Sequence, residues 1–231
     1  MLQRGDFLIS KIKDPHTSRK MISKLCLHPH SMVQHAILKR EDVTPSMLKR
    51  MLDISKDERI TSMRYHIINH KKMDEETLYT LSGYDNKQIV SLVLLTDKVS
   101  QRIIKKLQGS SDEEIRTMAQ VRDPETDPVF IGRIIKKEFK KVERVTNDYI
   151  DRHYTIMKNY TINDILEAAI RNPELPTEQV ELYKKCTKPV IISFVIPHPN
   201  ISKALLDYYD KNGDEEVKEA IANRNKEQYT H

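Results

Sequence analysis

The segment Asp214-Glu-Glu-Val-Lys-Glu-Ala-Ile-Ala-Asn223, close to the end of the chain, decides the fold class. Val217 is followed three and four positions later by the apolar residues Ala220 and Ile221, which is the spacing of one stripe of an amphipathic helix. Asp214 precedes this stripe, and an Asp at that place can accept hydrogen bonds from the free backbone N–H groups of a helix start. The segment therefore predicts a helix with one buried side.

The same pattern recurs along the whole chain. Its first β-branched residue serves as an anchor, and successive anchors are 27, 29, 26, 50, 26 and 26 residues apart. The anchors are Val33, Ile60, Ile89, Ile115, Ile165, Ile191 and Val217. The step of 50 is close to two periods and predicts a degenerate unit near Val142, and Phe7 lies one period before Val33. A period of about 26 residues thus gives about eight units, the first of them partial.

A second apolar stripe precedes each anchor by eleven and eight residues, so each unit is expected to hold two helices. Its members are Ile22 and Leu25, Leu78 and Leu81, Ile104 and Leu107, Tyr154 and Met157, Val180 and Tyr183, and Leu206 and Tyr209. Helix starts are expected at Val43-Thr44-Pro45, Met73-Asp74-Glu75, Val99-Ser100, Leu175-Pro176-Thr177 and Ile201-Ser202, where an apolar residue adjoins a capping residue. Second helices are expected to end at Asp123-Pro124, Asn172-Pro173 and His198-Pro199, since proline cannot continue a helix.

One helical pair cannot bury both of its stripes, so neighbouring pairs must stack. We therefore expect an all-α fold, an α-solenoid of about eight two-helix repeats. The pattern of Asn-Pro joint, short first helix, Asp-Glu-Glu-Val second helix and closing Ala-Ile-Ala-Asn resembles variant leucine-rich repeats, which are related in shape to the HEAT and armadillo solenoids. Asp214 to Asn223 and Ile165 to Pro173 carry the resemblance best, and it extends over most of the chain. It implies a solenoid with a binding surface but no particular ligand.

The domain organisation follows from the same repeat. We expect a single domain over 1–231, with N-terminal repeats in 1–124, an irregular basic helical unit in 125–160 and C-terminal repeats in 161–231. Between Thr126 and Tyr160 the joint is missing, which favours one long helix or a tight helical pair. An iron–sulfur module, known from a member of the resembled family, would need a cysteine cluster that this sequence lacks.

Composition bounds the environment of the protein. Charged residues make up 32% of the chain and hydrophobic residues 38%, which favours a soluble folded protein over a membrane or disordered one. Neither a signal peptide nor eighteen consecutive apolar residues is recognisable. Cys26 and Cys186 match no disulfide or metal spacing, so we expect free buried thiols in a reducing compartment, the cytoplasm, or the host-cell cytoplasm if the protein is viral.

A run of cations in the irregular unit is the best candidate binding site. It comprises Arg133, Lys136, Lys137, Lys140, Lys141 and Arg144, with only Glu138 and Glu143 nearby. On a helix these cations line one broad face that could neutralise several phosphates of a nucleic acid or meet an acidic protein patch. The alternative is the solvated side of a helix whose apolar side, Ile131, Ile134, Ile135, Phe139 and Val142, is core. A second basic set, which could extend the footprint, comprises Lys39, Arg40, Lys49, Arg50, Arg64, Lys71 and Lys72.

Positions one and two residues after the anchors are expected to form a contact row for a partner protein. They include Gln34, His35, Thr61, Ser62, Arg116, Thr117, Lys218 and Glu219. A non-catalytic scaffold that binds a partner protein is accordingly the first functional hypothesis, and a solenoid that binds nucleic acid is the alternative. The formal net charge of +5 permits the alternative without demanding it.

The sequence contains few features that would indicate a metal site or an enzyme. His66 and His70, together with His28, His30 and His35, are the only local concentration of histidines, and no HExxH or paired CxxC motif supports a metal site. Glycine-rich phosphate loops and nucleophile elbows are also missing, so no cofactor and no enzymatic activity are expected. A HEAT-like DNA glycosylase is a remote alternative, weakened because those enzymes use a tryptophan platform and this chain has no Trp. The tyrosines, among them Tyr65, Tyr154, Tyr183, Tyr208 and Tyr209, are mostly predicted to pack in the core.

Overall fold

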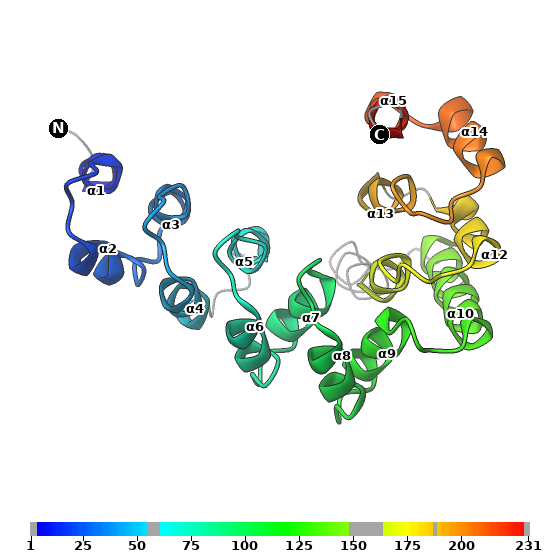
Figure 1. Cartoon of the computed structure of the whole chain (residues 1–231), viewed down its shortest axis with the longest axis horizontal. Coiled ribbons are helices and arrows are strands. Elements are labelled where there is room, and N and C mark those ends of the chain that lie inside the picture. The colour runs from blue at the N-terminus through cyan, green and yellow to red at the C-terminus, as the bar shows by residue number, and fades with distance from the viewer. Residues whose placement is uncertain (1–3, 55–60, 148–163, 187–188, 229–231) are drawn as a thin grey trace. The chain divides into compact units, whose positions relative to one another are not determined.

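The computed structural model describes residues 4–54, 61–147, 164–186 and 189–228, and its regular structure there is entirely helical (Figure 1). The expected all-α fold class is therefore confirmed. The chain divides into two compact units, Met1–Ile103 and Ile104–His231. None of the described helices combines the length and the apolar character needed to cross a membrane.

Unit 1 is built from short helices that alternate between two rows (Figure 1). They are α1 Arg4–Lys13, α2 Arg19–Leu25, α3 Ser31–Leu38, α4 Pro45–Ile54, α5 Thr61–Ile68, α6 Glu75–Leu81 and α7 Lys87–Leu95, and α8 Gln101–Gln108 spans the boundary to unit 2. Within the first row α1 contacts α3, α3 contacts α5 and α5 contacts α7, while α4 contacts α6 in the second row. The helices α3 and α7 of the first row contain the anchors Val33 and Ile89, and α5 begins one residue after the anchor Ile60, so these helices correspond to the second helices of the expected units.

The apolar periodicity places the core correctly in both units. All described anchors are buried, namely Val33, Ile89, Ile115, Ile165, Ile191 and Val217. The anchor Ile60 and the stripe residues Tyr154 and Met157 lie outside the described side chains. Phe7, expected to be buried one period before Val33, is instead 57% exposed. Among the described side chains of α1, Ile12 is the buried one.

Side-chain caps define most helix starts. Asp74 accepts from the backbone N–H of Thr77 at 2.8 Å, and Ser202 accepts from that of Leu205 at 3.0 Å, as predicted. Two other expected caps are wrong. The Ser100 hydroxyl is buried without a hydrogen-bond partner. The N-cap residue of the helix Thr177–Val180 is Pro176, whose side chain cannot accept a hydrogen bond.

Unit 2 continues with helices of more varied length. They are α9 Glu113–Arg122, α10 Pro128–Asn147, a helical stretch at 164–170, α12 Thr177–Val180, η2 Glu181–Lys185, α13 Pro189–Val195, α14 Lys203–Asn212 and α15 Glu215–Gln228. The helix α10 contacts α9, α12 and η2, and α15 contacts α13 and α14. A single helix of 20 residues thus occupies most of the region where a degenerate unit near Val142 was expected.

Polar side chains at the ends of second helices connect consecutive joints, and we call this set of bonds the joint ladder. In unit 1, Arg40 Nη1 donates to the carbonyl oxygens of Ile12 at 2.5 Å and Asp14 at 3.0 Å. His70 Nε2 lies 3.0 Å from the carbonyl oxygen of Leu38, and Lys98 Nζ donates to the carbonyl oxygen of His70 at 2.7 Å. These bonds satisfy carbonyl groups near helix ends, which lack partners within their own helix.

The joint ladder recurs in unit 2. Asn172 Nδ2 donates to the carbonyl oxygen of Asp123 at 3.0 Å, and His198 Nε2 lies 3.0 Å from that of Asn172. Arg224 Nη1 donates to the carbonyl oxygens of Ile196 at 2.8 Å and His198 at 3.3 Å. Since Asn172 bonds directly to Asp123, the joints that flank α10 are neighbours in space.

Candidate binding surfaces

The cations of α10 lie on the side of the helix opposite to its core contacts. The exposed members are Arg133, Lys136, Lys137, Lys140 and Lys141, and we call them the α10 basic face. Ile131 and Ile135 are buried on the other side, where the Phe139 ring meets the Tyr183 ring edge-on at a centroid distance of 5.6 Å. The predicted division of this helix into a core side and a charged side is confirmed. The side chains of Val142, Glu143 and Arg144 lie outside the described part.

Most of the α10 basic face lacks a compensating carboxylate. Lys141 Nζ lies 2.5 Å from Glu138 Oε1, and the Glu138 side chain is buried. Among the described residues, the other four cations of this face have no ion-pair partner. Some exposed cations elsewhere are paired, as Arg102 on α8 is with Glu76 at 2.7 Å and Lys71, in the turn after α5, is with Glu41 at 2.9 Å.

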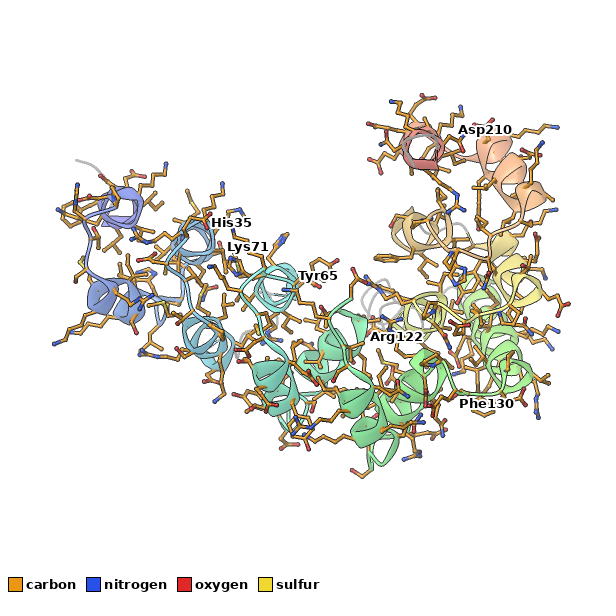
Figure 2. The ribbon with its side chains drawn as sticks, viewed as in Figure 1. His35, Tyr65, Lys71, Arg122, Phe130 and Asp210 are labelled. Atoms are coloured by element: carbon orange, nitrogen blue, oxygen red, sulfur yellow. The ribbon has the colours of Figure 1, made fainter. Side chains whose placement is uncertain are left out.

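A second surface lies on the second helices of unit 1. Phe7 on α1 and Met32 on α3 are each 57% exposed, and Tyr65 on α5 is 38% exposed. His35 and His66, on α3 and α5, are exposed as well, and their rings meet edge-on at a centroid distance of 5.9 Å. We call Phe7, Met32, His35, Tyr65 and His66 the unit 1 row; Figure 2 labels His35 and Tyr65 on their neighbouring helices.

The unit 1 row corrects one expectation about the tyrosines. Tyr183 and Tyr209 are buried as predicted, Tyr208 is half-buried, and Tyr65 is exposed. The Tyr65 ring lies 6.0 Å from that of His66. Among the described side chains of α5, Arg64 is one of four buried residues, with Met63, Ile67 and Ile68, and Tyr65 lies on the exposed side of the helix. Only the helix phase relative to its neighbours distinguishes these two positions.

The expected partner row is only partly free to bind. His35, Lys218 and Glu219 are exposed, whereas the side chains of Thr61 and Ser62 are not described. Gln34 is wrongly predicted to be exposed: it is fully buried on α3, which packs against α1, and its Nε2 donates to the carbonyl oxygen of His28.

Two further members of that row bond to backbone nearby. Arg116 and Thr117 on α9 are half-buried. Arg116 Nη1 donates to the carbonyl oxygen of Ser110 at 2.6 Å, and Thr117 Oγ1 donates to that of Glu113 at 2.7 Å. These two side chains therefore bond to the backbone at the start of α9 and are not fully exposed for contact with a partner.

Three arginines of the N-terminal basic set make contacts that support the fold. Arg40 belongs to the joint ladder, and Arg50 Nη1 donates to Ser23 Oγ at 2.7 Å. Arg64 is 1% exposed and donates to Gln88 Oε1. The guanidinium groups of these three arginines bind carbonyl or side-chain oxygens, so they are already engaged within the protein.

A shallow polar cavity of about 420 Å³ lies in unit 2 where α9 ends. It is lined by Lys105, Gln108, Gln120, Asp123, Glu125, Thr126, Asp127 and Phe130. Lys105 Nζ bridges Asp123 at 2.8 Å and Glu125 at 2.7 Å, and Gln108 Nε2 also donates to Asp123. These bonds raise the pKa of Lys105 above its ordinary value, chiefly through the hydrogen bond to Asp123. The cavity thus has the polar contacts of a stabilised joint.

The histidines and cysteines do not assemble a metal site in the described part of the chain, where no group of three or more His, Cys, Asp or Glu is placed to hold an ion. His66 and His70 make different contacts: the His66 ring meets that of His35, while His70 belongs to the joint ladder. Cys26 and Cys186 are buried thiols that form no disulfide, as predicted. Burial raises the pKa of the Cys26 thiol to about 11, which disfavours its reactive thiolate form.

No protein-family model, curated protein or solved structure matches the chain. The fold and its surfaces therefore define an all-helical protein that is compatible with a helical-repeat architecture.

Proposed function

We propose that this protein is a non-catalytic α-solenoid of about eight two-helix units, similar to HEAT, armadillo or variant leucine-rich repeat proteins, that binds a partner protein. The repeat is supported by bonds that join residues about one period apart, such as Arg102 to Glu76 and His198 to Asn172. Stacked helical pairs offer an extended surface along one row of helices, and proteins of this architecture commonly use it for binding.

The exposure of the unit 1 row is the observation that carries the proposal. Single exposed apolar side chains are common on soluble proteins. Here, however, Phe7, Met32 and Tyr65 stand on three second helices that contact one another in succession. Aromatic residues and methionine are enriched at protein interfaces because they remove large apolar areas from water. The unit 1 row is accordingly the proposed docking surface.

The charges around the unit 1 row favour a partner surface with an acidic rim. The helices α3 and α5 contain no acidic residue, and exposed Lys39 directly follows α3. Exposed Lys11 lies over the Phe7 ring at 5.9 Å. Opposite charges at the rim of an interface speed association and exclude wrong partners.

The proposal is tested by capture of partners on the immobilised full chain from cells that produce it naturally. The variant Met32→Glu/Tyr65→Glu places two carboxylates in the unit 1 row. We expect it to weaken the binding of the captured protein by about tenfold or more, because charge enters an apolar contact. The matched control is Met21→Glu/Leu27→Glu, which adds the same charge at two exposed apolar residues outside the row.

The control should bind as the unaltered chain does. Equal binding by both variants and the unaltered chain would exclude the unit 1 row as the docking surface. Retention of oligonucleotides without any protein partner would exclude a protein-binding scaffold altogether.

A further inference from the structure

We propose that the α10 basic face binds the phosphate backbone of double-stranded nucleic acid, as a second site that is independent of the unit 1 row. The four cations without an ion-pair partner in the described residues, Arg133, Lys136, Lys137 and Lys140, form this site together with Lys141. The phosphates would take the place of carboxylates, none of which pairs with these four side chains among the described residues.

The charge of the face is free to act on a ligand. Where Arg102 binds Glu76, a phosphate would have to displace a carboxylate already in contact with the guanidinium. Among the described residues, no carboxylate would have to be displaced from Arg133, Lys136, Lys137 or Lys140. Binding of each to a phosphate releases a counterion from the duplex, which is the main source of sequence-independent affinity.

The geometry suits a surface with densely spaced charges. From Arg133 to Lys141 the helix rises by about 12 Å, at 1.5 Å per residue. At 100° per residue the five cations fall within an arc of about 140°, so they face the same side of the helix. A duplex carries one negative charge per roughly 1.7 Å of its axis. A face of this length therefore lies opposite several phosphates at once.

The helix holds the face in place. Buried Ile131 and Ile135 attach α10 to the core of unit 2, and Phe139 packs against the buried Tyr183 ring. Gly132 allows a close approach of α12, since a Cβ at this position would lie 3.3 Å from Gln179 Cγ. A rigidly presented face loses less conformational entropy on binding than cations on a free loop.

The side chains beside the cations favour a duplex over other polyanions. Single strands are bound largely by stacking of bases on aromatic rings. The two aromatic residues of α10, Phe130 and Phe139, are only half-exposed, the first at the polar cavity and the second against Tyr183. An acidic protein would be expected to need several exposed apolar anchors as well, and among the described side chains of this helix Val129 is the large apolar one that is exposed.

The test is fluorescence anisotropy of the full chain with a short labelled duplex of mixed sequence at increasing salt. If four phosphates are neutralised, the logarithm of the affinity falls with the logarithm of salt with a slope of about −3.6. The affinity then drops about 150-fold between 50 and 200 mM salt. In Lys137→Glu/Lys140→Glu we expect about tenfold or greater loss of affinity at low salt, and a slope reduced to about −1.8.

The matched control is Lys203→Glu/Lys211→Glu, which changes the net charge equally at two exposed lysines of α14. It should bind nearly as the unaltered chain does, and circular dichroism should show that both variants fold. No duplex binding at 50 mM salt, equal loss in the control, or full affinity in the α10 variant would overturn the proposal. So would tighter binding of a labelled single strand or of a polyglutamate peptide than of the duplex.

The outcome is separable from that of the protein-binding proposal. The variant Met32→Glu/Tyr65→Glu should retain duplex binding within the change seen for the α14 control, because it leaves α10 unaltered. Loss of duplex binding in that variant beyond the control would contradict an independent site.

Discussion

At the scale of single residues, His198 shows how one side chain couples two units. It is 4% exposed, its Nε2 lies 3.0 Å from the carbonyl oxygen of Asn172, and its Nδ1 accepts from the backbone N–H of Asn200 at 3.1 Å. Both bonds are made by the neutral imidazole with its proton on Nε2. Protonation of Nδ1 would place two N–H donors against each other at Asn200.

The pKa of His198 is correspondingly lowered. Burial is the largest cause and the nearby Arg224 guanidinium adds to it, while the bond to the Asn172 carbonyl opposes them. A lowered pKa in the folded state means that the unfolded chain binds more protons below the ordinary histidine pKa of about 6.5. Stability contributed by His198 is therefore present at neutral pH and is lost as pH falls below that range.

This sign predicts a pH-dependent effect of His198→Gln. At pH 7 the substitution should lower the free energy of unfolding by about 1 to 3 kcal/mol, because the carbonyl of Asn172 is left poorly satisfied. At pH 5 the difference between the two proteins should shrink. Urea unfolding at both pH values measures it, and an equal difference at both would contradict a role for neutral imidazole.

Single residues also show which structural features can be predicted from residue type and which cannot. The sequence predicts Asn172 and His198 as joint residues because each precedes a proline, which ends a helix locally. Their acceptors are carbonyl groups of the preceding joint and depend on how the units stack. The predictions for Gln34 and Tyr65 are wrong for the same reason. Whether the Gln34 amide is buried and whether the Tyr65 ring is exposed depend on how the neighbouring helices pack.

At the scale of helices, tyrosines join three elements of unit 2. The Tyr183 hydroxyl on η2 donates to the carbonyl oxygen of Leu166 at 2.7 Å, and the Tyr209 hydroxyl on α14 donates to the carbonyl oxygen of Tyr183 at 2.5 Å. Burial raises the pKa of both hydroxyls, so they remain protonated donors. The Phe139 contact adds α10 to this cluster.

Removal of one hydroxyl tests the cluster. Tyr183→Phe keeps the ring and its contact with Phe139 but leaves the carbonyl of Leu166 without this donor, so we expect a loss of about 1 to 2 kcal/mol in the free energy of unfolding. Tyr208→Phe is the matched control, because the Tyr208 ring is half-buried and no hydrogen bond of its hydroxyl is described. Chemical denaturation should give a lower free energy of unfolding for Tyr183→Phe than for Tyr208→Phe. Equal values for the two variants would show that the Tyr183 hydroxyl does not stabilise the fold.

The basic helix belongs to this scale as well. Its apolar and charged sides were predictable, because a 3.6-residue period sorts side chains within one helix. The pairing of its cations was not, since Arg102 and Lys71 find carboxylates 26 and 30 residues earlier in the chain, whereas Arg133 and Lys137 find none in the described residues.

At the scale of the molecule, each helical pair contacts chiefly its sequence neighbours, so damage should remain local. Asn172→Ala removes the Nδ2 donor that binds the carbonyl oxygens of Val121 and Asp123, at the end of α9. We expect faster amide hydrogen exchange around these joints in unit 2 and unchanged exchange in α1 to α6 of unit 1. The control is Asn212→Ala, whose amide bonds only to Tyr208 within the exposed side of α14. Uniformly faster exchange over the whole chain would contradict this local coupling.

The sequence by itself determined the all-helical class, most helix starts and the buried anchors. These features depend on neighbours within one or two turns of chain, as for Asp74 at a helix start or Val33 in a stripe. Tertiary structure alone decided that Gln34 is buried, that Tyr65 is exposed, that Arg64 occupies a core position, and which cations are paired. The physical reason is that burial and pairing depend on atoms one period away, whose position no local pattern specifies.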